Sequence, residues 1–260
     1  MGSGSVEMPS WKWAAASSRG TSHEKTGDRL QDAYVCFVPN VVPESIFAIV
    51  CDGAGTADFG GQGASLVCRS VSKNARLHFA QSAALPNDET IEEWFDESRD
   101  LIFAVASRRG QQPRDFASTA VCVISTGDES LIAHVGDGCA VLKDANIGKW
   151  VAPSWPDHGE YASTTFFVTD EPSIRLRISK YPGTVKALAV FSDGIERLAL
   201  DFSSKIPSDR FFDRIIAPIA SSQTCGRDAL LSVQLEEFLA SPAVNARTDD
   251  DKSLVIAARA

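Results

Sequence analysis

Three apolar runs in this chain end in an Asp-Gly pair, and this feature limits what the chain can fold into. The pairs are Asp52-Gly53, Asp137-Gly138 and Asp193-Gly194, while Asp32 and Asp249-Asp250-Asp251 precede two further apolar runs. One Asp-Gly pair is most often a hairpin turn. Several carboxylates at one edge of packed sheets, however, repel one another unless a cation neutralises them. Because carboxylate oxygens suit Mg²⁺ or Mn²⁺, the pattern predicts a divalent-metal site.

The order of the remaining elements predicts an α+β fold. Runs rich in β-branched and aromatic residues predict strands at 33–38, 45–51, 118–125, 130–136, 140–143, 164–169, 174–179, 186–192 and 253–258. Apolar residues at three- and four-residue spacing predict helices at 61–80, 88–108, 209–221 and 226–240. Surface loops are expected around Pro153 and Pro156 and at 203–209. In such an order, sheets pack together and helices cover their outer faces.

Length and composition predict one domain, 11–260, after a flexible segment 1–10. A net charge of -9 without a basic run argues against a nucleic acid or an anionic membrane as partner. No apolar run reaches the roughly 18 residues that span a bilayer. The six cysteines lack a C-x-x-C pair, so they are expected to be buried thiols of a cytoplasmic protein.

Several other sites are excluded by spacing. Asp58 occupies the third glycine position of a dinucleotide loop that would begin at Gly53. The run at 249–251 lacks the glycine and terminal glutamate of a calcium-binding EF-hand loop. His23-Glu24 has no second histidine for a zinc protease helix, and no G-x-S-x-G sequence is present.

An ordered set of motifs resembles the PP2C-type (PPM) metal-dependent protein phosphatases. The set comprises Gln31-Asp32-Ala33, Asp52-Gly53-Ala54-Gly55, Gly63-Ala64-Ser65, Ser118-Thr119-Ala120, Gly136-Asp137, Phe191-Ser192-Asp193-Gly194 and Asp250-Asp251-Lys252-Ser253-Leu254. The resemblance extends from about residue 12 to the end of the chain. Gly20-Thr21-Ser22-His23 together with Gln31-Asp32 is most similar to the compact bacterial branch.

This resemblance implies a four-layer α/β/β/α sandwich of two antiparallel sheets flanked by helices, with two Mg²⁺ or Mn²⁺ ions between the sheets. By the family's motifs, Asp52 bridges both ions, the Gly53 carbonyl binds one, and Asp193 and Asp250 complete the other. Asp32 steadies these ligands and belongs to the catalytic set, and Asp137 matches the position of a third, weaker metal.

The implied activity is hydrolysis of phosphoserine and phosphothreonine in proteins. Two cations lower the pKa of a bridging water, whose hydroxide attacks the phosphorus in line without a covalent enzyme intermediate. The implied partner is a phosphorylated protein, either the target of a Ser/Thr kinase or the kinase itself, in bacterial signalling.

The chain departs from the family pattern at four positions. Gln31 replaces a ligand glutamate, Gly27 a phosphate-binding arginine, Ala54 a histidine that protonates the leaving group, and Arg197 an acid. We expect His23 and Arg29 to bind the phosphate instead, because a cation near the metals suits a phosphate dianion.

Three alternatives to a protein phosphatase stay open at this point. One is a catalytically weak or inactive PP2C-like module that binds phosphoproteins. Another is a phosphatase of small phosphorylated metabolites, and the last is an α+β domain with acidic turns. Retention of Asp52, Asp193 and Asp250 favours activity, because neighbouring carboxylates are costly without a metal.

Overall fold

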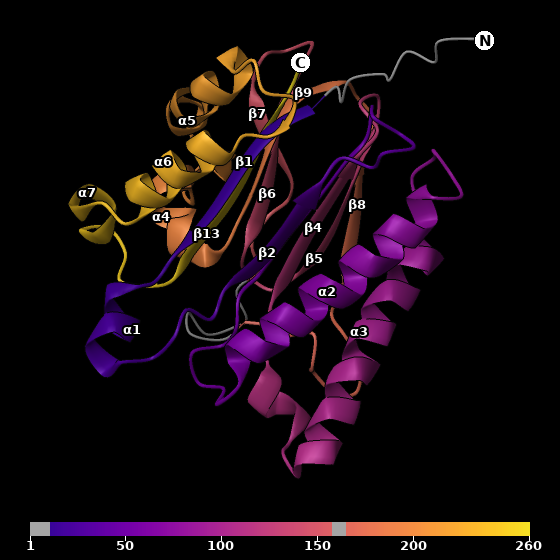
Figure 1. Cartoon of the computed structure of the whole chain (residues 1–260), viewed down its shortest axis with the longest axis vertical. Helices are drawn as coiled ribbons and strands as arrows, with labels where there is room; N and C mark the ends of the chain where they lie inside the picture. Colours follow the sequence, from indigo (N-terminus) through magenta and orange to yellow (C-terminus); the bar gives the residue numbers. More distant parts are fainter. Residues whose placement is uncertain (1–10, 158–164) are drawn as a thin grey trace.

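The computed structural model describes residues 11–157 and 165–260, whose helices and strands form four layers (Figure 1). The first sheet has the order β12-β1-β13-β9-β6-β7, formed by β12 (Gly226–Arg227), β1 (Trp11–Ser18), β13 (Lys252–Arg259), β9 (Val185–Phe191), β6 (Cys139–Asp144) and β7 (Trp150–Ser154). The second has the order β2-β3-β4-β5-β8, formed by β2 (Ala33–Phe37), β3 (Ile46–Cys51), β4 (Ala120–Ser125), β5 (Ser130–Val135) and β8 (Arg177–Tyr181). All pairs are antiparallel except β1 with the two-residue β12.

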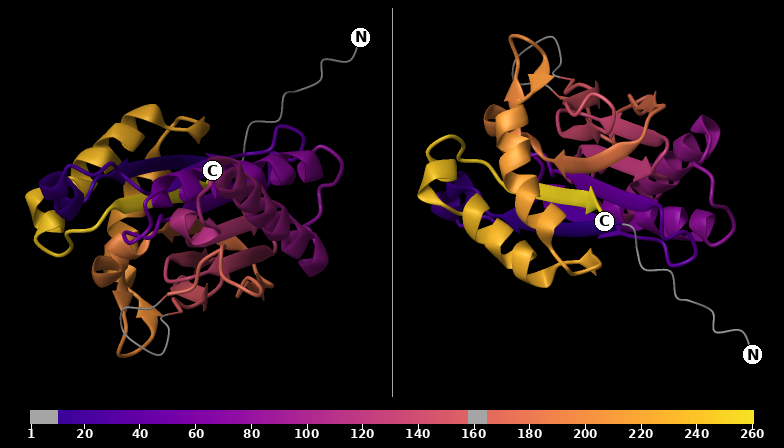
Figure 2. Two further views of the ribbon diagram at one scale, coloured as in Figure 1. Left: turned by 90° about the horizontal axis from the view of Figure 1, so that it is seen from below. Right: turned by 90° about the horizontal axis from the view of Figure 1, so that it is seen from above.

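Helices cover the outer face of each sheet, as the views in Figure 2 also show. The long helices are α2 (Gly60–Phe79) and α3 (Asp88–Arg109) on the five-stranded sheet, and α5 (Asp209–Ser221) and α6 (Ala229–Leu239) on the six-stranded sheet. The short elements are α1 (Thr21–Thr26), η1 (Pro113–Phe116), η2 (Asp193–Ile195), α4 (Glu196–Ala199), α7 (Pro242–Asn245) and the hairpin of β10 (Leu200–Asp201) and β11 (Ile206–Pro207). Among the described residues, no helix is long and apolar enough to cross a membrane.

Alternation along the strands explains why their apolar runs are continuous. In β3, Phe47 and Ile49 face the cluster under α2 and α3, whereas Ile46 and Val50 face the six-stranded sheet. Both faces are thus covered, so every residue of β3 is buried. Such a strand lacks the polar alternation of a sheet that is exposed on one face.

Local sequence fixes the ends of the helices. Asn87 caps α3 by accepting a hydrogen bond from the Thr90 amide (2.8 Å), and Asp228 caps α6 in the same way through the Leu231 amide (3.0 Å). Gly110 ends α3 with a φ of 66°, a backbone conformation that glycine adopts without strain. The four long helices form near their predicted residues, although α6 begins at Ala229 and not at residue 226.

The predicted α+β class and four-layer sandwich are confirmed, but one predicted strand, 164–169, is wrong. In its described part, the Phe167 amide donates to Asp170 Oδ2 (2.9 Å) and the Asp170 amide to the Phe167 carbonyl (3.1 Å), which makes a turn. The Val168 side chain is fully buried against the five-stranded sheet and its helices. The apolar run at these residues therefore reflects a buried turn.

Three strands of the six-stranded sheet were not predicted from the sequence: β1, β7 and the two-residue β12, which lies at the start of the predicted helix 226–240. β1 is rich in alanine, which has a low strand propensity, but it pairs with β13 along all eight of its residues. β7 contains Pro153, which suggested a loop. Because β7 is an edge strand, its open side has no partner strand that would need a hydrogen bond from an N–H at Pro153.

Candidate functional site

The first predicted ligand, Asp52, directly follows β3 and is held by β4. The Asp52 amide donates to Thr119 Oγ1 (3.2 Å), and the Thr119 amide donates to the Asp52 carbonyl (2.8 Å). Gly53 then passes so close to the start of α2 that a Cβ there would lie 2.2 Å from the Gly60 carbonyl carbon. Only glycine allows this approach, which fixes the path of the chain beside Asp52.

Asp193 and Asp250 lie at the same edge because β9 and β13 are antiparallel neighbours. Phe191 pairs with Leu254, so the residues that follow β9 lie beside those that precede β13. A Cβ on Gly194 would lie 1.9 Å from the Asp251 carbonyl oxygen, and this position therefore requires glycine. β3 packs against β9 and β13 across the two sheets, which brings Asp52 to the same region.

Asp32 is buried at the start of β2 and supports this edge from within. Ser192 Oγ donates to Asp32 Oδ2 (2.7 Å) and accepts from the Ser253 amide (3.0 Å). Burial raises the pKa of Asp32 to about 6, although the hydroxyl groups of Ser192 and Ser253 act to lower it. Ser192 thereby links three of the motifs that the sequence analysis singled out.

The pKa values of Asp52 and Asp193 report the charges of the other predicted carboxyl groups. Burial raises the pKa of Asp52 well above its ordinary value, and the charges of Asp32, Asp193 and Asp250 raise it further. Burial also raises the pKa of Asp193 to about 8, with contributions from Asp137 and Asp250. The raised pKa values of Asp52 and Asp193 mean that the protein resists ionising both carboxyl groups without a cation.

These groups fit a divalent cation in their chemistry. Asp193 Oδ1 and Asp32 Oδ1 are buried without a hydrogen-bond partner among the described residues. A cation would satisfy both oxygens and cancel the repulsion that raises the pKa values. Within the described ranges, however, no three His, Cys, Asp or Glu side chains form a ready-made metal-binding group. The ligand set therefore stays a prediction.

A cavity of about 330 Å³ opens beside this cluster. Its lining residues include Asp193, Asp250, Arg197 and Arg247. His23, from α1, lies near the cavity: its Nδ1 is 3.0 Å from Asp251 Oδ2, and its charge lowers the raised pKa of Asp250, for which burial is the main cause.

Comparisons with known proteins identify the family. A sequence model of the family "Protein phosphatase 2C" matches residues 19–240. The chain belongs to this family. Serine/threonine-protein phosphatase 3 of Escherichia coli (strain K12) is 36% identical over 252 residues, which are 95% of this chain and 98% of that protein. The prediction that the chain is a serine/threonine phosphatase of this family is confirmed.

Solved structures support the fold of this phosphatase. The structure of PppA, described as a key regulatory component of T6SS in Pseudomonas aeruginosa, has a TM-score of 0.68 at 16% identity and covers 97% of this chain and 99% of that chain. Serine/threonine phosphatase Stp1 from Staphylococcus aureus has a TM-score of 0.63 at 15% identity and covers 100% of this chain and 99% of that chain.

The two residues predicted to bind phosphate have different positions in the phosphatase. His23 lies beside the carboxyl cluster, next to Asp251. Arg29 is exposed and forms no hydrogen bond or ion pair with the described residues. The geometry thus brings His23 to the cluster but gives Arg29 no fixed contact there.

Asp251 has a structural role that the sequence analysis missed. It is 2% exposed, and its two oxygens accept hydrogen bonds from the Gly20 and Gln31 amides, both at 2.6 Å. It thereby ties the segment that carries His23 and Asp32 to the start of β13. Lys252 was missed as well: it is fully buried, and its Nζ donates to the Asp250 carbonyl (3.1 Å) and to Asn245 Oδ1 (3.0 Å). The run Asp250-Asp251-Lys252 was the available signal.

Asp251→Asn is expected to destabilise the phosphatase by about 1–3 kcal/mol, because an amide nitrogen would face one of two buried N–H donors. Activity should fall too, since the segment with Asp32 loosens. Urea unfolding of the variant and of Asp249→Asn, an exposed neighbour, measures the effect. Equal stabilities of the two variants would contradict the role assigned to Asp251.

Gln31 is a departure from the family pattern that lies beside the predicted ligand Gly53. With its amide nitrogen turned toward two carbonyls, the Gln31 side chain donates to the Gly53 oxygen (3.0 Å) and to the Ala54 oxygen (3.2 Å). The Gly53 carbonyl, a predicted metal ligand, thus has a competing donor. Gln31 differs from the family's glutamate only in that an amide nitrogen replaces one carboxylate oxygen.

Gln31→Glu is expected to lower the Mn²⁺ concentration that gives half-maximal activity by roughly tenfold, because a carboxylate replaces a hydrogen-bond donor beside the Gly53 carbonyl. The metal-free variant should also melt at a lower temperature than the wild type, since it adds a charge to the cluster. Activity titrations and melting curves in EDTA test both effects. An unchanged Mn²⁺ requirement would show that residue 31 is not near a metal.

Proposed function

We propose that this phosphatase hydrolyses phosphoserine and phosphothreonine in proteins and depends on two Mg²⁺ or Mn²⁺ ions, with Asp137 at a third, weaker site. The observation that carries the proposal is that Asp52 and Asp193 lie at one edge of the two sheets, where burial and the charges of Asp32, Asp137 and Asp250 raise their pKa values. Asp52, the Gly53 carbonyl, Asp193 and Asp250 would hold the ions. Bound there, the ions would supply a nucleophilic hydroxide and stabilise charge on the phosphoryl oxygens.

The chain's own residues contribute position and charge. Asp32 is fixed by Ser192 and orients the neighbouring ligands. His23 adds positive charge beside Asp250 when it is protonated, which favours a phosphate dianion in the cavity. Residue 54 is alanine, so no side chain at that position protonates the leaving alkoxide. We therefore expect slow turnover of substrates with poor leaving groups.

The biological setting is part of the proposal. A single domain, 11–260, would act in the cytoplasm in bacterial signalling, on the targets of a Ser/Thr kinase or on the kinase itself. Support comes from the family and from a relative that is named a serine/threonine-protein phosphatase. The alternative of an inactive phosphoprotein-binding module is not favoured, because the neighbouring carboxylates are retained at a cost.

Hydrolysis of a phosphothreonine peptide in EDTA, Mg²⁺ or Mn²⁺ tests the proposed activity. We expect turnover with either metal and none in EDTA. Asp128→Asn, in an exposed turn between β4 and β5, is the matched control and should keep the wild-type rate. Turnover that persists in EDTA would refute the metal dependence, and the absence of turnover in every condition would favour the binding module.

A further inference from the structure

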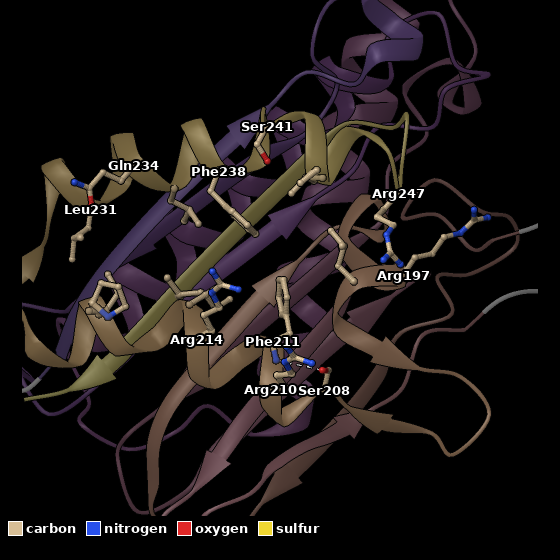
Figure 3. Close-up of a pocket in the computed structure, with 18 residues that line it drawn as sticks. Arg197, Ser208, Arg210, Phe211, Arg214, Leu231, Gln234, Phe238, Ser241 and Arg247 are labelled. Atoms are coloured by element: carbon tan, nitrogen blue, oxygen red, sulfur yellow. Dashed lines mark hydrogen bonds between the residues drawn. The ribbon is translucent and has the colours of Figure 1, made fainter.

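A groove of about 690 Å³ lies between α5 and α6, on the side of the six-stranded sheet that faces away from the other sheet (Figure 3). Ile219, Leu235 and Ile256 contribute to its apolar lining. Two aromatic side chains also line it, Phe211 from α5 and Phe238 from α6, and Phe238 is 38% exposed. Exposed aromatic side chains beside an apolar surface are typical of sites that bind another molecule.

The charge of the groove is opposite to that of the whole protein. Its lining contains four arginines and no Asp or Glu, although the chain has 34 acidic and 25 basic residues. The arginines are Arg197, Arg210, Arg214 and Arg247. None of their guanidinium groups forms an ion pair or hydrogen bond within the described ranges. A positive surface of this kind on an acidic protein selects a negatively charged occupant.

The helix α5 separates its charges by face. Arg210 and Arg214 are four residues apart, so they lie on the same side of the helix, and both line the groove. Asp213 is instead bound to Lys143 and to the Trp150 indole N–H, and it does not line the groove. The two arginines are therefore not neutralised by the one acidic residue between them.

The groove adjoins the candidate catalytic cavity. Arg197 and Arg247 line both the groove and the cavity that contains Asp193 and Asp250. Figure 3 places these two arginines at one end of the groove, with Leu231 and Gln234 toward the other. A chain bound along the groove would thus lead toward the carboxyl cluster.

We propose that this groove docks a segment of the phosphoprotein substrate that combines acidic side chains with large apolar ones. The apolar side chains would contact Phe211 and Phe238, and the acidic ones Arg210 and Arg214. The proposal rests on the proposed function, and it defines a substrate class: phosphoproteins with an acidic, apolar segment near the phosphorylated residue. An aromatic and arginine lining is the composition that most often dominates binding energy at protein interfaces.

Binding without turnover tests the groove independently of catalysis. The probe is a fluorescent, unphosphorylated peptide with alternating Asp, Leu, Glu and Phe, whose anisotropy is measured in EDTA. Arg210→Glu with Arg214→Glu is expected to weaken binding by at least about tenfold, because two attractive charges become repulsive. The control, Arg108→Glu with Arg114→Glu, makes the same charge change at exposed residues of α3 and η1 and should bind as the wild type does.

A charge swap provides the decisive comparison. A peptide with Lys in place of Asp and Glu should bind the Arg210→Glu, Arg214→Glu variant more tightly than it binds the wild type. Equal affinity of the acidic peptide for wild type and variant would overturn the proposal. So would binding to phosphatidylglycerol vesicles without binding of the peptide, because the groove would then recognise an anionic membrane.

Catalytic preference provides the second readout. A phosphothreonine peptide is compared with the same peptide joined by a Gly-Ser linker, on either side, to the acidic, apolar segment. The wild type should prefer the extended peptide by about tenfold in kcat/KM, and the charge-reversed variant should lose this preference. If no peptide is hydrolysed, the proposed function fails while the anisotropy result still decides the groove. A preference that survives in the variant would overturn the docking role.

Discussion

Asp52→Asn and Asp193→Asn are each expected to lower phosphothreonine peptide hydrolysis by on the order of 10²–10³-fold or more, while raising the melting temperature of the metal-free protein. Activity falls because each variant loses a charged metal ligand. Stability rises because burial and the neighbouring charges oppose ionisation of each carboxyl group, and the amide that replaces it has no charge. A gain of about 1 kcal/mol corresponds to about 2–4 °C for a chain of this size.

The opposite signs of these two effects make the prediction specific. Most substitutions at buried positions destabilise a protein, so a stability gain with loss of activity is typical of a functional cluster under electrostatic strain. Melting curves in EDTA and initial rates in Mn²⁺ measure the two quantities, with Asp128→Asn as the surface control. If Asp52→Asn and Asp193→Asn lower both activity and stability, the carboxyl groups stabilise the fold instead.

Stability of the metal-free protein is expected to fall as pH rises from about 4 to about 8. The pKa of Asp193 is raised from 3.8 to about 8 in the folded protein, so the folded state holds this proton more tightly than the unfolded chain does. The resulting stabilisation is complete below the unfolded pKa and is lost as pH rises through the folded pKa. Asp32, with a pKa raised to about 6, adds to the loss over the lower part of this window.

Metal binding should show the complementary pH dependence. A cation requires ionised carboxylates, so each proton that it displaces makes its apparent affinity rise about tenfold per pH unit. The increase in melting temperature caused by Mn²⁺ should therefore be larger at pH 8 than at pH 6. Asp193→Asn should flatten both pH dependences. A Mn²⁺ effect that is the same at pH 6 and pH 8 would contradict the assignment of these pKa values to the metal-binding cluster.

The burial of the strands that precede Asp52 and Asp193 was easier to predict from the sequence than the composition of the sheets. Asp52 and Asp193 follow apolar runs that are buried on both faces, so their local pattern reports their position directly. β1 was missed because alanine has a low strand propensity, and this segment is a strand only because it pairs with β13. Long-range pairing of this kind leaves no local signal.

The details of the site depended on contacts that spacing does not encode. Asp250 and Asp251 are adjacent and chemically identical, yet Asp251 is buried by the Gly20 and Gln31 amides while Asp250 faces the cavity. In the sequence, only the family motif distinguished Asp250 from Asp251, and the local pattern gave no reason to separate them. The four arginines of the groove likewise come from α4, from α5 and from the loop after α7, and only the fold brings them together.

Counting the Mn²⁺ ions bound at equilibrium is the most direct test of the proposed metal centre. Equilibrium dialysis of the wild type at pH 8 should show saturable binding of two Mn²⁺ per chain, with a third bound only at higher concentration. Asp193→Asn should lose at least one of the two, and Asp128→Asn should lose neither. No saturable binding, or the same stoichiometry and affinity in Asp193→Asn as in the wild type, would contradict a metal centre at these carboxyl groups.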